Sequence, residues 1–216
     1  MPTSPQRTTA RERILDGALR VIREKGYSAT TVDDLCAAAE VTKGAFFHHF
    51  ASKEQLAVEA AGHWSTLTGA LFDAAPYHAA RTARERVLGY VDFRRAILQG
   101  RVADYTCLVG TMVQEVHASS PAIRAACARS ITGHAATLER DIADALAEAG
   151  ARGVDAHGLA LHTQGVLQGA FILAKATQDV AAAAESIGHL RTYLEFLFDR
   201  PRRGRRPSTA RRKETP

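Results

Sequence analysis

The apolar residues of this chain recur with the period of an α-helix almost from end to end, and this pattern constrains the fold most. Ile14, Leu15, Ala18, Leu19 and Ile22 form one such stripe near the N-terminus. Gly and Pro are sparse inside the long segments, and no run alternates β-branched with polar residues. The pattern predicts an all-α protein.

Cap and stop signals divide this pattern into separate helices. Thr31 precedes Val32, Asp33 and Asp34, which places a hydroxyl cap before acids in a first helical turn, and Gly26 ends the preceding helix. The signals predict N-terminal helices at about 9–25, 32–39, 43–49 and 53–71. Longer helices are predicted at about 81–99, 102–118, 121–149, 156–178 and 181–198.

The composition fits a globular protein. Apolar residues make up 46% of the 216 residues and charged residues 24%. No stretch is long and apolar enough for a membrane helix, and the polar first 13 residues predict no secretory signal. Cys36, Cys107 and Cys127 are odd in number and far apart, so they predict neither a disulfide framework nor a zinc site. We therefore expect a cytoplasmic protein without membrane, metal or cofactor.

The positive charge is concentrated at the C-terminus. Residues 199–216 hold eight Lys and Arg against two Asp and Glu, whereas residues 54–198 hold 12 against 15. This basic segment has almost no apolar residues and is expected to be disordered. It is either a solvated extension or an arm that adds sequence-independent attraction to phosphates.

Residues 26–53 combine two short helices with a tight turn. Val32, Leu35, Val41, Phe46 and Phe50 supply apolar contacts to the flanking helices. The second short helix is left with a face of small and hydrogen-bonding groups, which allows close approach to a duplex. This arrangement fits a helix-turn-helix that places its recognition helix in the major groove of DNA.

The runs GYSATTVDDL and VTKGAFFHHFASKEQL resemble the DNA-binding domain of the TetR family of bacterial regulators. The resemblance implies an N-terminal three-helix helix-turn-helix domain at 1–53 and a C-terminal helical ligand-binding and dimerisation domain at 54–198. It implies a homodimeric repressor that leaves a palindromic double-stranded DNA operator when a small-molecule inducer, of unknown identity, binds.

The resemblance also assigns DNA contacts by position. Two residues depart from the family pattern: Phe47 stands where Tyr is frequent, and Glu40 stands in the turn where many members have Gly. The expected DNA-binding residues are Thr31, Thr42, Lys43, Gly44, Ala45, Phe47, His48, His49 and Lys53. Thr31 and Lys53 are expected on phosphates, and His49 is as readily a packed structural histidine as a DNA contact.

The resemblance implies an inducer cavity among the helices of the second domain, so the ligand-binding candidates are side chains on these helices. The candidates are Trp64, Tyr90, Phe93, Cys107, Met112, Glu115, His134, Gln168 and Lys175.

The run TCLVGTMVQEV resembles a subgroup in which some members sense electrophiles or oxidants through a cysteine, here Cys107, partnered by Lys175. A nearby ammonium lowers the pKa of a thiol and activates it. The alternative is that Cys107 is an inert packed residue.

An all-helical enzyme is the other functional alternative. The sequence contains no GxGxxG, GxSxG, P-loop, HExxH or CxxC motif, and the nine histidines form no persuasive ligand set. We therefore expect a regulator and not an enzyme, with repression and activation indistinguishable from the sequence.

Overall fold

The computed structural model describes residues 8–199, and this part of the chain contains helices and no strand. The prediction of an all-α fold is confirmed. The helices are α1 (Ala10–Lys25), α2 (Val32–Ala39), α3 (Lys43–His49), α4 (Lys53–Asp73), α5 (Ala83–Ala96), α6 (Val102–Tyr105), α7 (Leu108–Val116), α8 (Pro121–Ala149), α9 (Ala156–Thr177) and α10 (Val180–Phe198). A 3₁₀ turn, η1 (Pro76–Ala79), joins α4 to α5.

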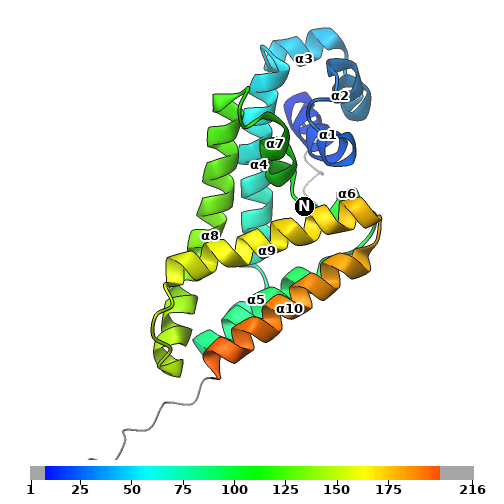
Figure 1. Ribbon diagram of the computed structural model, residues 1–216. Helices are drawn as coiled ribbons and strands as arrows, with labels where there is room; N and C mark the ends of the chain where they lie inside the picture. The colour runs from blue at the N-terminus through cyan, green and yellow to red at the C-terminus, as the bar shows by residue number, and fades with distance from the viewer. Residues whose placement is uncertain (1–7, 200–216) are drawn as a thin grey trace, which may run out of the picture.

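The three short N-terminal helices gather at one end of the molecule (Figure 1). From there α4 and α8 run side by side toward the other end, with α7 packed between them and α1. Helix α9 crosses this pair, and α10 packs against α9 and α5. The long helices α4 and α8 therefore connect the two ends of the protein.

Side-chain caps set the starts of the N-terminal helices, as the sequence predicts. The Thr31 hydroxyl accepts a hydrogen bond from the Asp34 N–H at 3.1 Å, and the Asp34 carboxylate accepts one from the Thr31 N–H at 2.7 Å. Thr9 and Glu12 form the same reciprocal arrangement at the start of α1. These pairs satisfy N–H groups that a helix leaves unpaired, so the boundaries are fixed locally.

The single helix predicted over 102–118 is wrong. The Asp104 carboxylate accepts a hydrogen bond from the Arg101 N–H at 2.8 Å and caps the start of the one-turn helix α6. Thr106 is then extended, and Cys107 caps a new helix, α7, with its Sγ 3.4 Å from the Gly110 nitrogen. A local side-chain cap thus interrupts an apolar pattern that continues through the break.

Two clusters of buried residues make up the core. One joins α1–α3 to the first turns of α4 and to parts of α7 and α8, with Ile14, Phe46 and Phe50 fully buried. The other joins α5, α8, α9 and α10 around residues such as Leu167 and Ile187. Helices α4 and α8 contribute to both clusters, so a shift in either helix affects both ends of the molecule. The domain boundary at residue 53 stays a prediction.

Two further expectations concern membrane spans and the C-terminal segment. Within residues 8–199, no helix is long and apolar enough to span a membrane. The predicted basic disordered segment, 199–216, lies outside the described residues except for Asp199.

Candidate nucleic-acid interface and ligand pocket

Helix α3 has one buried face and one exposed face. Phe46 is fully buried, whereas the adjacent Phe47 is 54% exposed. Among the predicted contact residues, Thr42, Lys43, Gly44 and His48 are exposed, and Ala45 and His49 are half-buried. Near Gly44, an added Cβ would meet only the hydroxyl of Thr42, at 3.7 Å. Within residues 8–199, the start of α3 at Gly44 is therefore not covered by another element, and this face is open to a partner.

One exposed ion pair engages Lys43 on the exposed face of α3. The Lys43 ammonium lies 2.8 Å from the Asp33 carboxylate of α2. Hydrogen bonding and charge from Asp33 raise the pKa of Lys43. A solvent-exposed pair of this kind is weak, so Lys43 can exchange Asp33 for a phosphate.

The Lys53 ammonium is already hydrogen-bonded within the protein, unlike that of a lysine open to phosphate. It donates hydrogen bonds to the carbonyl oxygens of Tyr27 at 3.1 Å and Thr30 at 2.8 Å, and lies 4.4 Å from the centre of the Tyr27 ring. It therefore fastens the start of α4 to the loop between α1 and α2. Its contact with phosphate stays a prediction.

Glu40 ends α2 in the left-handed region, with φ 54° and ψ 49°. This backbone conformation is strained for residues other than glycine. The side chain is exposed at the turn that leads into α3. Having Glu instead of Gly at position 40 therefore adds both backbone strain and a negative charge next to the exposed face of α3.

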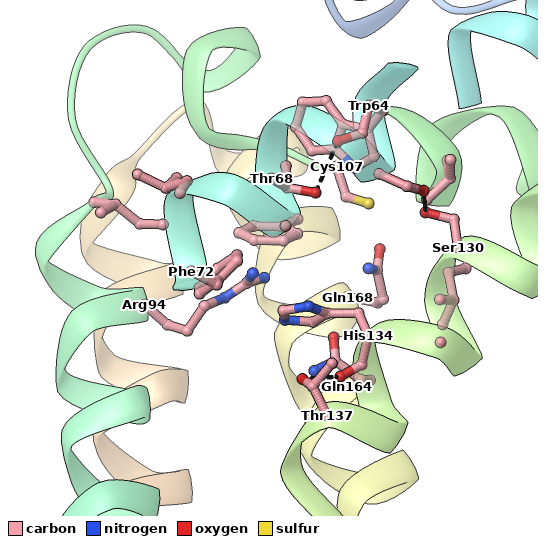
Figure 2. A pocket seen from close by; sticks show the side chains of 18 of the residues that line it. Trp64, Thr68, Phe72, Arg94, Cys107, Ser130, His134, Thr137, Gln164 and Gln168 are labelled. Atoms are coloured by element: carbon pink, nitrogen blue, oxygen red, sulfur yellow. Dashed lines mark hydrogen bonds between the residues drawn. The ribbon is translucent and has the colours of Figure 1, made fainter. Parts of the chain in front are cut away.

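A cavity of about 350 Å³ lies at the other end of α4, among α4, α5, α8 and α9 and the start of α7. Figure 2 shows Cys107, His134, Gln168 and Arg94 directed toward the same space. Four of the predicted ligand-binding residues line this cavity: Trp64, Cys107, His134 and Gln168.

A buried hydrogen-bond chain forms one side of the cavity. The Gln164 amide donates to the Tyr90 hydroxyl at 2.9 Å, and this hydroxyl lies 3.0 Å from Nε2 of His134. Burial, reinforced by the charge of Arg94, lowers the pKa of His134 to about 4. The ring is thus neutral at pH 7. Because Tyr90 accepts from Gln164, its own proton is directed to Nε2, which assigns the His134 proton to Nδ1.

The remaining predicted ligand residues do not line this cavity. Tyr90 and Phe93 pack behind its wall, where both rings contact Phe72. Met112 is fully buried in the N-terminal core. Glu115 accepts hydrogen bonds from the loop after α1, and Lys175 donates to the Thr111 hydroxyl at 2.6 Å.

Sequence reasoning missed Arg94, Thr68, Phe72, Ser130 and Gln164, which line the cavity. One signal was available for Arg94. It follows the buried Val91 by three residues and precedes the buried Leu98 by four, so a cation stands on the apolar face of α5.

The three thiols lie in different surroundings. Cys36 and Cys127 are buried, and burial raises the pKa of Cys127 to about 12. Cys107 is half-buried and lines the cavity, where its sulfur accepts the Gly110 N–H. The ammonium of Lys175 is half-buried, and burial lowers its pKa while negative charge on Cys107 would raise it. In this structure Thr111, and not Cys107, is its hydrogen-bond partner. Over residues 8–199, no cluster of His, Cys, Asp and Glu is arranged to hold a metal ion.

Comparison with known families identifies the family of this chain. Residues 14–60 match the family described as "Bacterial regulatory proteins, tetR family", and residues 83–184 match "Transcriptional regulator LmrA/YxaF-like, C-terminal domain". The chain belongs to the TetR family. The first match covers the helix-turn-helix and the start of α4, and the second covers most of the helices around the cavity.

Individual relatives of this TetR-family protein are similar over different lengths. The HTH-type transcriptional repressor DhaR of Mycobacterium sp. is 48% identical over 48 residues, which are 22% of this chain and 24% of DhaR. The transcriptional regulator AcuR of Cereibacter sphaeroides is 28% identical over 150 residues, which are 69% of this chain and 67% of AcuR. The chain therefore matches about a quarter of DhaR, whereas its match with AcuR extends well beyond the helix-turn-helix.

Solved TetR-family structures share the whole fold. The regulatory protein TetR from Rhodobacter sphaeroides has a TM-score of 0.77 at 22% identity, covering 86% of this chain and 99% of that one. The reduced form of E. coli NemR has a TM-score of 0.72 at 20% identity, covering 85% and 95%. Both likenesses concern the fold: a helix-turn-helix followed by a helical domain.

Proposed function

We propose that this TetR-family protein is a transcriptional repressor that binds a palindromic operator as a homodimer and leaves it when a small molecule enters the cavity. The proposal rests on one observation: α4 begins just after the exposed helix α3 and also lines the cavity of about 350 Å³. Because its proposed target is operator DNA, the proposal also assigns the protein to the cytoplasm. The relatives DhaR and AcuR, described as a repressor and a regulator, support this function.

In this proposal α3 enters the major groove. Thr42, Lys43, Gly44, Phe47 and His48 supply the outward groups, with Ala45 and His49 at the edges of this face. Lys43 contacts phosphate after leaving Asp33, while Thr31 and Lys53 act at the DNA backbone. Phe47 offers apolar contact, such as with a thymine methyl group.

A second copy of the chain is the proposed partner of α9 and α10. These helices expose Ile172, Leu173, Val180, Tyr193 and Phe196, with exposed fractions between 41% and 75%. Several large apolar side chains exposed on two packed helices are typical of an interaction surface. A dimer also gives two recognition helices the spacing of successive major grooves, which a helix-turn-helix needs for specific binding.

Operator binding and dimerisation can be tested together. The full chain should shift a duplex from its own upstream region, and Lys43→Ala should weaken this binding. Phe196→Glu should convert the dimer to a monomer in light scattering and abolish the shift. Leu67→Glu, which alters a residue 47% exposed on α4, is the matched control and should remain dimeric. A wild-type protein that is monomeric, or that binds no upstream duplex at moderate salt, would refute the proposal.

A second candidate function is electrophile or oxidant sensing through Cys107. It is favoured by the position of this half-buried thiol in the cavity at the start of α7, unlike the buried Cys36 and Cys127. A quinone that forms a thioether with Sγ should release DNA from the wild type, and Cys107→Ser should stay bound. If the quinone releases both proteins equally, Cys107 is not the sensor.

A further inference from the structure

Arg94 is a cation without an anionic partner among residues 8–199. Its guanidinium makes no ion pair and no hydrogen bond with any residue in the described range 8–199. By contrast Arg86, two turns earlier on α5, lies 2.7 Å from the Asp141 carboxylate. The Arg94 guanidinium lines the cavity and points toward His134 (Figure 2).

Aromatic rings hold the guanidinium in place. Its central carbon lies 5.1 Å from the centre of the Phe72 ring, 5.6 Å from that of Phe171 and 6.0 Å from that of Tyr90. Such cation–π contacts stabilise a cation but leave its N–H donors unused. A half-buried guanidinium with free donors can bind an anion, because its planar fork matches a carboxylate.

The other ionisable groups of the cavity do not neutralise Arg94. Asp104 is engaged by Arg101, whose guanidinium lies 3.2 Å from Oδ1 and whose N–H donates to Oδ2. His134 is neutral, and Arg129 adds a further cation at the exposed edge. The phenols of Tyr105, which lines the cavity, and of Tyr90, behind its wall, are neutral as well, because burial raises the pKa of both. The cavity therefore has positive charge available for a ligand.

We propose that the cavity binds a small organic carboxylate, with its charged end on Arg94 and its apolar body against Phe72, Phe171 and Leu98. Neutral donors and acceptors on Gln168 and His134 lie beside the same space, so they can orient the acid without repelling it (Figure 2). The volume of about 350 Å³ is at the lower end of ligand cavities, which favours a compact acid over a nucleotide or a coenzyme thioester. Because this is the inducer site of the proposed function, the ligand class rests on that proposal.

Trp64 provides a direct readout, since it is the chain's single tryptophan and lines the cavity. The full-length protein is titrated with hexanoate and cyclohexanecarboxylate, and with their uncharged amides, while Trp64 fluorescence is followed. No DNA is present, so failure of carboxylate binding and failure of operator binding are separate results. We expect saturable binding of at least one acid, about tenfold tighter than its amide.

Variants of α5 assign the preference to Arg94. Arg94→Met should remove the difference between acid and amide, and Arg94→Lys, which keeps the charge, should retain part of it. Arg95→Met changes the exposed neighbouring arginine and should bind like the wild type. Circular dichroism checks that each variant is folded. Equal binding of acid and amide by the wild type, no binding of either acid at millimolar concentration, or an undiminished preference in folded Arg94→Met would overturn the proposal.

Discussion

Glu115 of α7 accepts a hydrogen bond from the backbone N–H of Ser28, with 2.7 Å between the carboxylate oxygen and the nitrogen. The other carboxylate oxygen accepts the N–H of Tyr27 at 3.1 Å. Helix α7 begins at the cavity, where Cys107 caps it, and its last turn holds the loop that leads into α2. A change at the cavity that moves α7 therefore moves this loop directly, while α4 offers a second, parallel connection.

Removing this contact should weaken the link between cavity and DNA. We expect Glu115→Ala to bind operator DNA but to need a higher ligand concentration for release, because α7 no longer holds the loop. The free energy of unfolding should fall by about 1 kcal/mol, since the carboxylate is exposed and its hydrogen bonds are partly replaced by water. Release is measured by fluorescence anisotropy of labelled operator.

The control for this variant lies on the same helix. Gln114 is exposed and bonds only the carbonyl oxygen of Gly110 within α7, so Gln114→Ala should release DNA like the wild type. An unchanged release curve for Glu115→Ala would show that α4 alone carries the signal.

Gly26 is required by the same contact. Its φ of 87° is unfavourable for other residues, and a Cβ there would lie 2.6 Å from Oε1 of Glu115. Gly26→Ala should therefore lower the free energy of unfolding by about 1–3 kcal/mol. In a double-mutant cycle with Glu115→Ala the cost should shrink but persist, because the backbone strain remains. Gly62→Ala, in an open helical position, should be neutral or stabilising in the same urea titrations.

The two lysines of the DNA-binding end should behave differently. Lys53→Ala should lower the free energy of unfolding by about 1–2 kcal/mol, because its ammonium donates to two backbone carbonyls. Lys43→Ala should leave stability unchanged, since the Lys43 side chain is exposed. Both should weaken binding to all duplexes alike and flatten the salt dependence of the binding constant by about one phosphate contact. If Lys53→Ala lowers stability but keeps the wild-type salt slope, Lys53 has only a structural role.

The sequence predicted the DNA-binding end more completely than the cavity. Its helices begin at caps such as Thr31 and Thr42, which are local signals, and the alternation of buried Phe46 with exposed Phe47 follows from helical period. The cavity depends on which way α7 faces, and α7 starts anew after extended Thr106, at the Cys107 cap that splits the predicted helix over 102–118. With that break, Met112 faces the N-terminal core and not the cavity. Such long-range packing leaves little trace in local patterns.

The neutral state of His134 makes stability depend on pH. Its pKa is about 4 in the folded protein and near the ordinary 6.5 when unfolded, so between these values the unfolded chain binds more protons. The free energy of unfolding should therefore fall as the pH drops from 6.5 to 4, by about 3 kcal/mol at most from this group.

His134→Gln, which cannot titrate, should lose less stability over this interval in urea titrations of the ligand-free protein. Acidic residues titrate in both proteins, so the difference between the two pH dependences of the free energy of unfolding isolates the contribution of His134. His117→Gln changes an exposed histidine and should keep the wild-type dependence. Parallel curves for the wild type and His134→Gln would show that the ring is not held neutral by burial beside Arg94.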